Sequence, residues 1–280
     1  MEKFGILLKS YQGDFSFAER LVASFDAHNP HGIRMYLVVP EGDLELFSCF
    51  ASPTISVMSE APFAEHLVDA SIAGLRPGYI NQEIVKLGLV ENYFCVDSDA
   101  QFIRDISVED FIAPDGFPYT VLVEDNDLKV DPIYYQQYWQ PREAALRTIY
   151  SLVGLEDPII RTCHGHQVFS SEVLASFVRD FLTPRKWDYH DALAQAPYEF
   201  TWYNAWLLAS HVIPMHQREP LVKVYHHERQ HQEALLLGIT QSDLARGYLA
   251  VVVNGNFARE LTDVPSAGSK PEALAPYLSY

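Results

Sequence analysis

The sequence predicts an α/β fold with a mostly parallel sheet and a more helical second half. Over the first 125 residues, short apolar runs alternate with longer amphipathic segments, which is the order strand, helix, strand. From about residue 130 the pattern changes to longer helical segments. No internal repeat and no long linker divides the chain, so we expect one domain over residues 1–263, with halves at 1–125 and 126–263. Residues 264–280, rich in Pro, Ser and Ala, are expected to form a weakly ordered tail.

Five short runs in the first half are typical of buried strands. Each is bounded by polar or turn-forming residues. A strand, a helix and a second strand in this order predict parallel pairing through a crossover helix. The runs are FGILLK (4–9), RMYLVVP (34–40), TISVM (54–58), YFCV (93–96) and YTVLV (119–123).

Helices are predicted between these strands. In FSFAERLVASFDAH, three aromatic and aliphatic residues recur at a spacing of four and mark one helix face: Phe17, Leu21 and Phe25. The segment EGDLELFSCF predicts a second helix with Asp43 as its N-cap. The segment YINQEIVKLGLV (79–90) predicts a third, leading into the strand at 93–96.

The second half contains four helical segments and two short strand-like or loop segments. The helical ones are REAALRTIYSLVG, SEVLASFVRDFL, WDYHDALAQA and EFTWYNAWLLAS. The interruptions are RTCHGHQVFS and PLVKVYHH.

Charge and composition exclude several classes of protein. With 20 Lys and Arg against 37 Asp and Glu, the net charge is −17, which argues against binding to nucleic acid or electrostatic binding to an anionic membrane. No apolar run reaches the roughly 18 residues of a transmembrane segment. The apolar stretch near the N-terminus is too short for a signal peptide, and three widely spaced cysteines form no disulfide framework. We therefore expect a cytoplasmic protein, peripheral at the inner membrane through partners.

Polar residues gather where the predicted strands end. In parallel sheets, ligands bind beyond the carboxyl ends of the strands. The residues at those ends are Lys9, Ser10, Tyr11, Pro40, Glu41, Asp97 and Asp99.

Two aspartates separated by one residue follow the strand at 93–96. Asp97 and Asp99 could hold one Mg²⁺ or Mn²⁺ together with substrate phosphates, because such cations prefer oxygen ligands. Asp and Ser are also common turn residues. Asp125 and Asp127 have the same spacing after another apolar run, so spacing alone does not distinguish the two pairs.

The context of the first pair does distinguish it. The stretch NQEIVKLGLVENYFCVDSDAQFIRDIS resembles the region leading into the DxD motif of GT-A nucleotide-sugar glycosyltransferases. The opening ILLKSYQGDFSFAERLVASFDAHN and the later YLVVPEGDLELF resemble a bacterial group of these enzymes associated with surface polysaccharides. The similarity continues weakly through HQVFSSEVL, YEFTWYNAW and GYLAVVVNGNF.

The resemblance implies a GT-A fold, in which a Rossmann-like nucleotide-binding half (1–125) joins an acceptor-binding half (126–263). It implies transfer of a sugar from a nucleotide-sugar donor to a glycan or lipid-linked acceptor, with Mn²⁺ or Mg²⁺ held by Asp97 and Asp99. Glu199 matches the carboxylate that serves as catalytic base or acceptor anchor; a Glu at a helix N-terminus is also favoured by the helix dipole. The nucleotide-sugar ligands that it implies are Lys9, Ser10, Tyr11, Lys86, Asp97 and Ser98.

Histidines near residue 227 offer a rival metal site. The run His227-Glu228-Arg229-Gln230-His231 matches H-E-x-x-H, which on a helix could bind zinc and make the chain a hydrolase with Glu228 as general base. The expected further zinc ligands are not matched, and the motif lies far from the parallel sheet. GT-A enzymes often take a metal ligand from a C-terminal histidine, so the resemblance assigns His226 or His227 to the DxD metal.

The acceptor site has three candidates. His164 and His166 alternate around Gly165 and could bind a metal or a sugar hydroxyl, although they could equally be ordinary loop residues. Trp202, grouped with other aromatics, could stack on a sugar ring or belong to the core. A further alternative for the whole chain is a non-catalytic sugar- or nucleotide-binding protein of the same fold.

Overall fold

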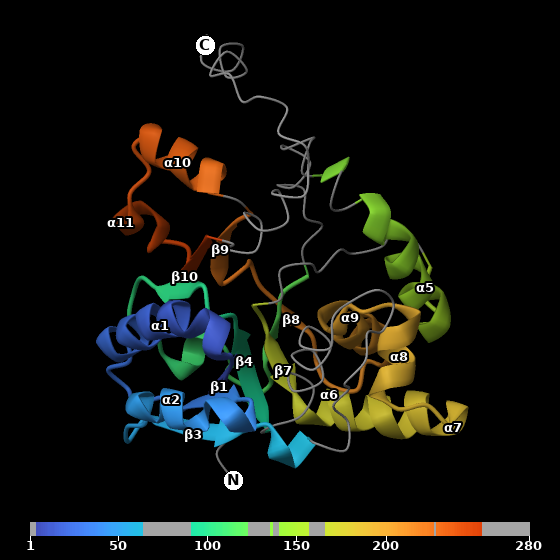
Figure 1. The fold of residues 1–280 in the computed structure, drawn as a ribbon. Coiled ribbons are helices and arrows are strands. Elements are labelled where there is room, and N and C mark those ends of the chain that lie inside the picture. The colour runs from blue at the N-terminus through green and yellow to red at the C-terminus, as the bar shows by residue number, and fades with distance from the viewer. Residues whose placement is uncertain are drawn as a thin grey trace, which may run out of the picture.

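The computed structural model describes most of the chain between residues 4 and 253 (Figure 1). The described ranges are 4–63, 91–122, 135–136, 140–156, 166–226 and 228–253.

A five-stranded sheet organises the first half of the chain. Its order is β3-β2-β1-β4-β7, in which the first four strands run parallel and β7 runs antiparallel to β4. This confirms the mostly parallel α/β fold and four of the five predicted strands. The strands are β1 (Gly5–Lys9), β2 (Met35–Val39), β3 (Ile55–Ser59), β4 (Asn92–Val96) and β7 (Val168–Ser170).

A second sheet of three strands extends from the end of β4. Its central strand, β10 (Ala250–Val253), runs antiparallel to β5 (Ala100–Phe102) and parallel to β9 (Val222–Tyr225). The strand predicted at 119–123 is shorter than expected and does not belong to the main sheet. Only β6 (Tyr119–Thr120) forms, and it pairs with β8 (His216–Gln217) rather than with the main sheet.

Helices in the first half agree with the pattern, with one correction. Helix α1 (Phe15–Ala27) buries its apolar face, as predicted. The second helical segment is a 3-10 turn followed by the four-residue α2 (Leu44–Phe47). Asp43 precedes α2, but its side chain makes no capping bond; its Oδ2 instead accepts the backbone N–H of Gln12 at 2.7 Å. The helix predicted at 79–90 lies outside the described residues.

The second half is more helical, as expected. A π-helical turn at Phe177–Leu182 joins α6 to α7. Figure 1 shows α5 to α9 grouped on one side of the molecule, with α10 and α11 apart from them. The helices are α5 (Glu143–Val153), α6 (Ser171–Ser176), α7 (Thr183–Arg185), α8 (Tyr189–Gln195), α9 (Glu199–Ser210), α10 (Glu228–Leu236) and α11 (Gln241–Leu244).

The two faces of the main sheet are covered by different elements. Alternate residues of β1 point to opposite faces. Ile6 and Leu8 pack with α1 and with the second sheet, whereas Leu7 packs with α6 and α9. The sheet is therefore a middle layer between α1 and the helical second half, and its carboxyl edge is shared by both.

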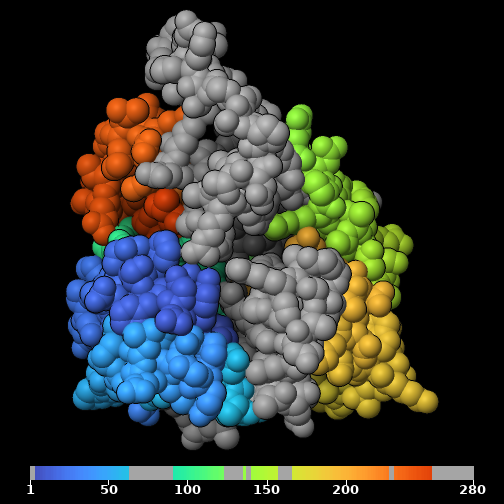
Figure 2. All heavy atoms as spheres, in the orientation of Figure 1, coloured from blue at the N-terminus to red at the C-terminus, as the bar shows by residue number. Residues whose placement is uncertain are grey.

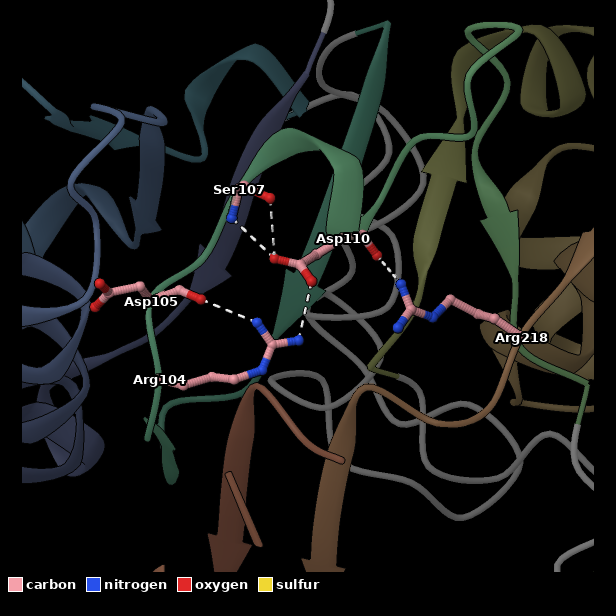
Figure 3. Close-up of polar contacts among 5 residues, drawn as sticks. All are labelled: Arg104, Asp105, Ser107, Asp110 and Arg218. Carbon is pink, nitrogen blue, oxygen red and sulfur yellow. Dashed lines mark hydrogen bonds and ion pairs between the residues drawn. The ribbon is translucent and has the colours of Figure 1, made fainter. Parts of the chain in front are cut away.

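A polar network fixes the loop that follows β5 (Figure 3). The Asp110 carboxylate accepts bonds from the Ser107 backbone and from Arg104, each at 2.9 Å, and the Asp110 carbonyl accepts one from Arg218. Burial lowers the pKa of Arg218 from its ordinary value, and the guanidinium keeps its charge as arginine does in proteins. The network ties residue 218 in the second half to the segment that continues from Asp97 and Asp99.

Candidate functional site

The loops after β1 and β4 lie side by side at the carboxyl edge of the main sheet. The register pairs Leu8 with Val96, so one further residue places Lys9 beside Asp97. The next pair, Ser10 and Ser98, is joined directly, because Ser98 Oγ donates a hydrogen bond to Ser10 Oγ at 3.0 Å. Both serines are buried. The structure thus brings together the two segments that the sequence predicts to bind the donor.

Asp97 and Asp99 flank the buried Ser98 and are themselves partly exposed. The Ala100 N–H donates to the Asp97 carbonyl at 3.0 Å, which closes a tight turn before β5. Alternation along this turn buries Ser98 against Ser10, while Asp97 and Asp99 on either side stay partly exposed. Two carboxylates one residue apart are a donor set of hard oxygen atoms.

Lys9 is buried and paired with a residue that the sequence reasoning missed. Its Nζ lies 2.9 Å from Oε2 of Glu60 and donates to the Ser10 carbonyl at 3.2 Å. Glu60 follows β3 directly, and its backbone N–H extends the ladder to Val39. Its position after the apolar run TISVM is the signal that could have identified it, since all carboxyl ends of these strands share one edge.

The ring of Tyr11 folds back over Gly13 in the loop after β1. A Cβ atom added at Gly13 would lie only 2.4 Å from Tyr11 Cε2 and 2.8 Å from Cζ. A side chain at residue 13 would therefore push the ring aside, whereas the backbone conformation of Gly13 does not itself call for glycine. Gly13 therefore sets the position of the tyrosine that the sequence assigns to nucleotide binding.

Changing Gly13→Ala is expected to displace Tyr11 and to weaken nucleotide binding by about tenfold, the ~1.4 kcal/mol of one lost base-stacking contact. Calorimetric titration with nucleoside diphosphates measures the effect. Gly42→Ala is the matched control, because Gly42 lies in the equivalent 3-10 turn after β2 with nothing within 4 Å of the added Cβ. Equal affinities in the two variants would remove Tyr11 from the nucleotide site.

The start of β7 faces the same edge from the second half. Because β7 is antiparallel to β4, its first residues lie beside the last residues of β4: the Cys95 N–H donates to the Gln167 carbonyl at 3.1 Å. Continuing this register places His166 beside Val96, next to Asp97. His166 is buried. His164 lies outside the described residues and stays a predicted acceptor residue.

Helix α9 packs along this segment and carries Glu199 as its first residue. Asn204 Nδ2 donates to Gln167 Oε1 at 3.0 Å, and the Tyr203 hydroxyl accepts the Ser170 N–H at 2.9 Å. Burial raises the pKa of Tyr203 well above its ordinary value, so this hydroxyl stays protonated. Glu199 is buried at the helix start, where the helix dipole stabilises a carboxylate.

The carboxyl end of β9 lies at the end of the second sheet where β5 begins, directly after Asp97 and Asp99. Val252 pairs with Ala100 on one side and with Val224 on the other. Asp99 precedes Ala100 in β5, and His226 follows Tyr225 in β9. Because β5 and β9 run in opposite directions, both residues extend from the same end of the second sheet. They are two strands apart, about 10 Å at the usual strand spacing. His226 is buried, and its N–H donates to Gln230 Oε1 at 2.8 Å.

The H-E-x-x-H segment is only partly described. Helix α10 begins at Glu228, and His227 lies outside the described residues, so its predicted ligand role stays a prediction. The His231 ring lies 5.1 Å from the Tyr225 ring, centroid to centroid. The described ranges contain no group of three or more His, Cys, Asp or Glu residues arranged to hold a metal.

Trp202 lies in the core rather than at the carboxyl edge. Its ring packs against Phe177 and Phe181, and its Nε1 donates to the Ala196 carbonyl at 2.8 Å. Its burial favours the core alternative over sugar stacking. Lys86, the remaining predicted nucleotide-sugar ligand, lies outside the described residues.

Comparison with known proteins gives likeness in structure only. No family model and no curated protein matches the chain. The apo structure of the bifunctional glycosyltransferase WbbM is similar with a TM-score of 0.51 and 11% identity, covering 98% of this chain and 51% of that one. The chain thus spans about half the length of WbbM. An active-site mutant of LgtC, a galactosyltransferase, is similar with a TM-score of 0.51 and 11% identity, covering 98% of this chain and 100% of that one.

Mouse xyloside xylosyltransferase 1 in its apo form has a TM-score of 0.46 at 10% identity, covering 91% of this chain and 98% of that one. At these identities the two stronger likenesses show the fold, which is the GT-A fold expected from the sequence. Within the described ranges, no helix is both long enough and apolar enough to cross a membrane.

Proposed function

We propose that the chain is a metal-dependent GT-A glycosyltransferase that transfers a sugar from a nucleotide-sugar donor to a glycan or lipid-linked acceptor. The observation that carries the proposal is the joined pair of loops at the carboxyl edge of the main sheet, where Ser98 between the two aspartates is bonded to Ser10. The proposed setting is the synthesis of bacterial surface polysaccharide, which rests on the sequence resemblance alone.

The residues present fit a divalent cation such as Mn²⁺ or Mg²⁺. These cations are commonly bound by one or two carboxylates while substrate phosphates complete the coordination. Asp97 and Asp99 supply the two carboxylates, on a turn held by the bond between Ser98 and Ser10. The metal would neutralise negative charge on the leaving diphosphate. His226, at the same end of the second sheet, is the described candidate for a further ligand.

The remaining residues divide between donor and acceptor. Lys9, Ser10 and Tyr11, on the loop after β1, would bind the nucleotide beside the aspartates. Glu199 would act on the acceptor hydroxyl, as general base in an inverting enzyme or as an anchor in a retaining one. Its place at the start of α9 supports this role, because α9 packs against the β7 segment that adjoins β4.

Hydrolysis of the donor tests the proposal. Wild-type protein is incubated with a panel of nucleotide sugars in Mn²⁺, in Mg²⁺ and in a chelator, and nucleoside diphosphate release is measured. One donor is expected to be hydrolysed only in the presence of metal. Binding of a donor without turnover, even with varied acceptors, would favour a non-catalytic binding protein. Stoichiometric zinc that His231→Ala removes would favour the hydrolase.

A further inference from the structure

Aliphatic side chains cluster on one exposed tip of the molecule. Four of the seven exposed large hydrophobic side chains in the described ranges lie within five consecutive residues: Leu235, Leu236, Leu237 and Ile239 are 56%, 86%, 74% and 37% exposed. The other three are dispersed over the chain. We call these four residues the apolar tip. Single exposed apolar residues are ordinary, whereas four of them within five consecutive residues are typical of an interaction surface.

The apolar tip is a rigid structure rather than a frayed helix end. Gly238 has a φ of +78°, and the Ile239 N–H bonds the Ala234 carbonyl at 3.0 Å, which together form a Schellman cap on α10. Immediately after it, Thr240 and Asp243 form a capping box that starts α11. The bonds from Thr240 lower the pKa of Asp243, so this box is intact at neutral pH. The leucines are therefore held outward by capped helices on both sides.

The segment that carries the apolar tip is less acidic than the chain as a whole. Residues 221–253 contain three basic residues (Lys223, Arg229, Arg246) and three acidic ones (Glu228, Glu233, Asp243), so their formal charge is zero against −17 for the chain. This segment therefore adds no net negative charge that anionic lipid would repel. Figure 2 shows its orange surface at the periphery of the molecule.

The size of the apolar tip argues against a second protein chain as its partner. A stable interface uses roughly 20–30 residues a side, whereas the tip offers four. A bilayer interface needs only a few aliphatic side chains, each contributing a transfer free energy of its own. We propose that the apolar tip inserts into the interfacial region of a lipid bilayer and binds the chain there directly, without a partner protein.

The tip is close to the proposed transfer site. Helix α10 has nine residues and joins the end of β9, where His226 lies, to the tip. Nine residues of α-helix span about 14 Å. A bilayer contacted by the tip would therefore lie within reach of a site that uses a lipid-linked acceptor. This use of the surface rests on the proposed function, but membrane binding itself does not.

Vesicle flotation of the full-length protein, without donor or acceptor, tests the inference. Wild type is expected to float with phosphatidylcholine vesicles and to be little affected by 0.5 M salt, about the range in which surface charge interactions are screened. Leu236→Glu combined with Leu237→Glu is expected to lower the bound fraction at least about tenfold, because charged residues replace the inserted side chains. Leu46→Glu, at an exposed leucine on α2, is the control and should bind like wild type.

Three outcomes would overturn the inference. Wild type failing to float is the first, and binding only to anionic vesicles with loss in salt is the second. The third is a wild-type dimer, seen by light scattering, that the double variant abolishes. Circular dichroism shows whether each variant is folded. Metal-dependent donor hydrolysis in solution should be retained by the double variant, so failure of membrane binding and failure of the proposed function are separable.

Discussion

Replacing Asp97 by Asn is expected to lower metal-dependent donor turnover by about 100-fold or more, the usual cost of losing one group that stabilises transition-state charge. The amide keeps the size of the side chain but removes the negative charge that would hold the cation. The buried bond between Ser98 and Ser10 is made by neighbouring side chains, so the turn itself should be retained. Donor hydrolysis at saturating metal measures the loss.

Asp125→Asn is the matched control, because Asp125 and Asp127 have the same sequence spacing. It is expected to leave turnover near the wild-type value. Direct titration with Mn²⁺ gives a second measurement that does not depend on activity: Asp97→Asn should bind the ion at least about tenfold more weakly, ~1.4 kcal/mol. Wild-type turnover and wild-type Mn²⁺ affinity in Asp97→Asn would refute the assignment of this pair as the metal site.

Lys9→Met is expected to lower the free energy of unfolding by about 3 kcal/mol, the lower end of the cost of breaking a buried ion pair. The Lys9 and Glu60 side chains are only 7% and 18% exposed, so the substitution leaves the Glu60 carboxylate largely buried without its partner. Methionine fills a similar volume, which separates loss of charge from loss of packing. Urea denaturation at pH 7 measures the change.

A double substitution, Lys9→Met with Glu60→Gln, should recover a large part of the lost stability, because no uncompensated charge then remains. The exposed pair of Arg147 and Glu143, with N···O at 3.0 Å, provides the comparison. Arg147→Met is expected to cost about 0.5 kcal/mol or less. A cost for Lys9→Met as small as that for Arg147→Met would show that the buried pair does not stabilise the fold.

The elements that depend on local pattern were predictable from the sequence. Four parallel strands, the apolar face of α1 and the helical second half follow from hydrophobic periodicity. The placement of Asp97 and Ser10 at one edge follows as well, because parallel strands align their carboxyl ends. The strand at 119–123 was predicted too long, since a short apolar run does not specify its partner; β6 pairs with residues nearly one hundred positions away.

Contacts between distant segments were not predictable. Glu60 is bound to Lys9, fifty-one positions away, and Asp43 caps no helix but accepts a bond from Gln12. The choice of Gly13 reflects the Tyr11 ring above it, which a sequence pattern does not show. Sequence periodicity reports which face of an element is buried, whereas these contacts depend on how the elements are assembled. For Trp202 the sequence offered both the core and sugar stacking, and the structure places it in the core.

The hydrogen bond between Ser10 and Ser98 has a thermodynamic consequence for the two loops that it joins. One loop carries the proposed nucleotide ligands and the other the proposed metal ligands, and neither can shift without straining or breaking a buried bond. If binding at each loop changes the energy of this bond, the affinities of the two loops for their ligands are coupled. The linkage is reciprocal. The factor by which bound metal raises the affinity for nucleotide therefore equals the factor by which bound nucleotide raises the affinity for metal. Ser98→Ala removes this bond and is expected to reduce that common factor, which titration of nucleotide with and without Mn²⁺ measures.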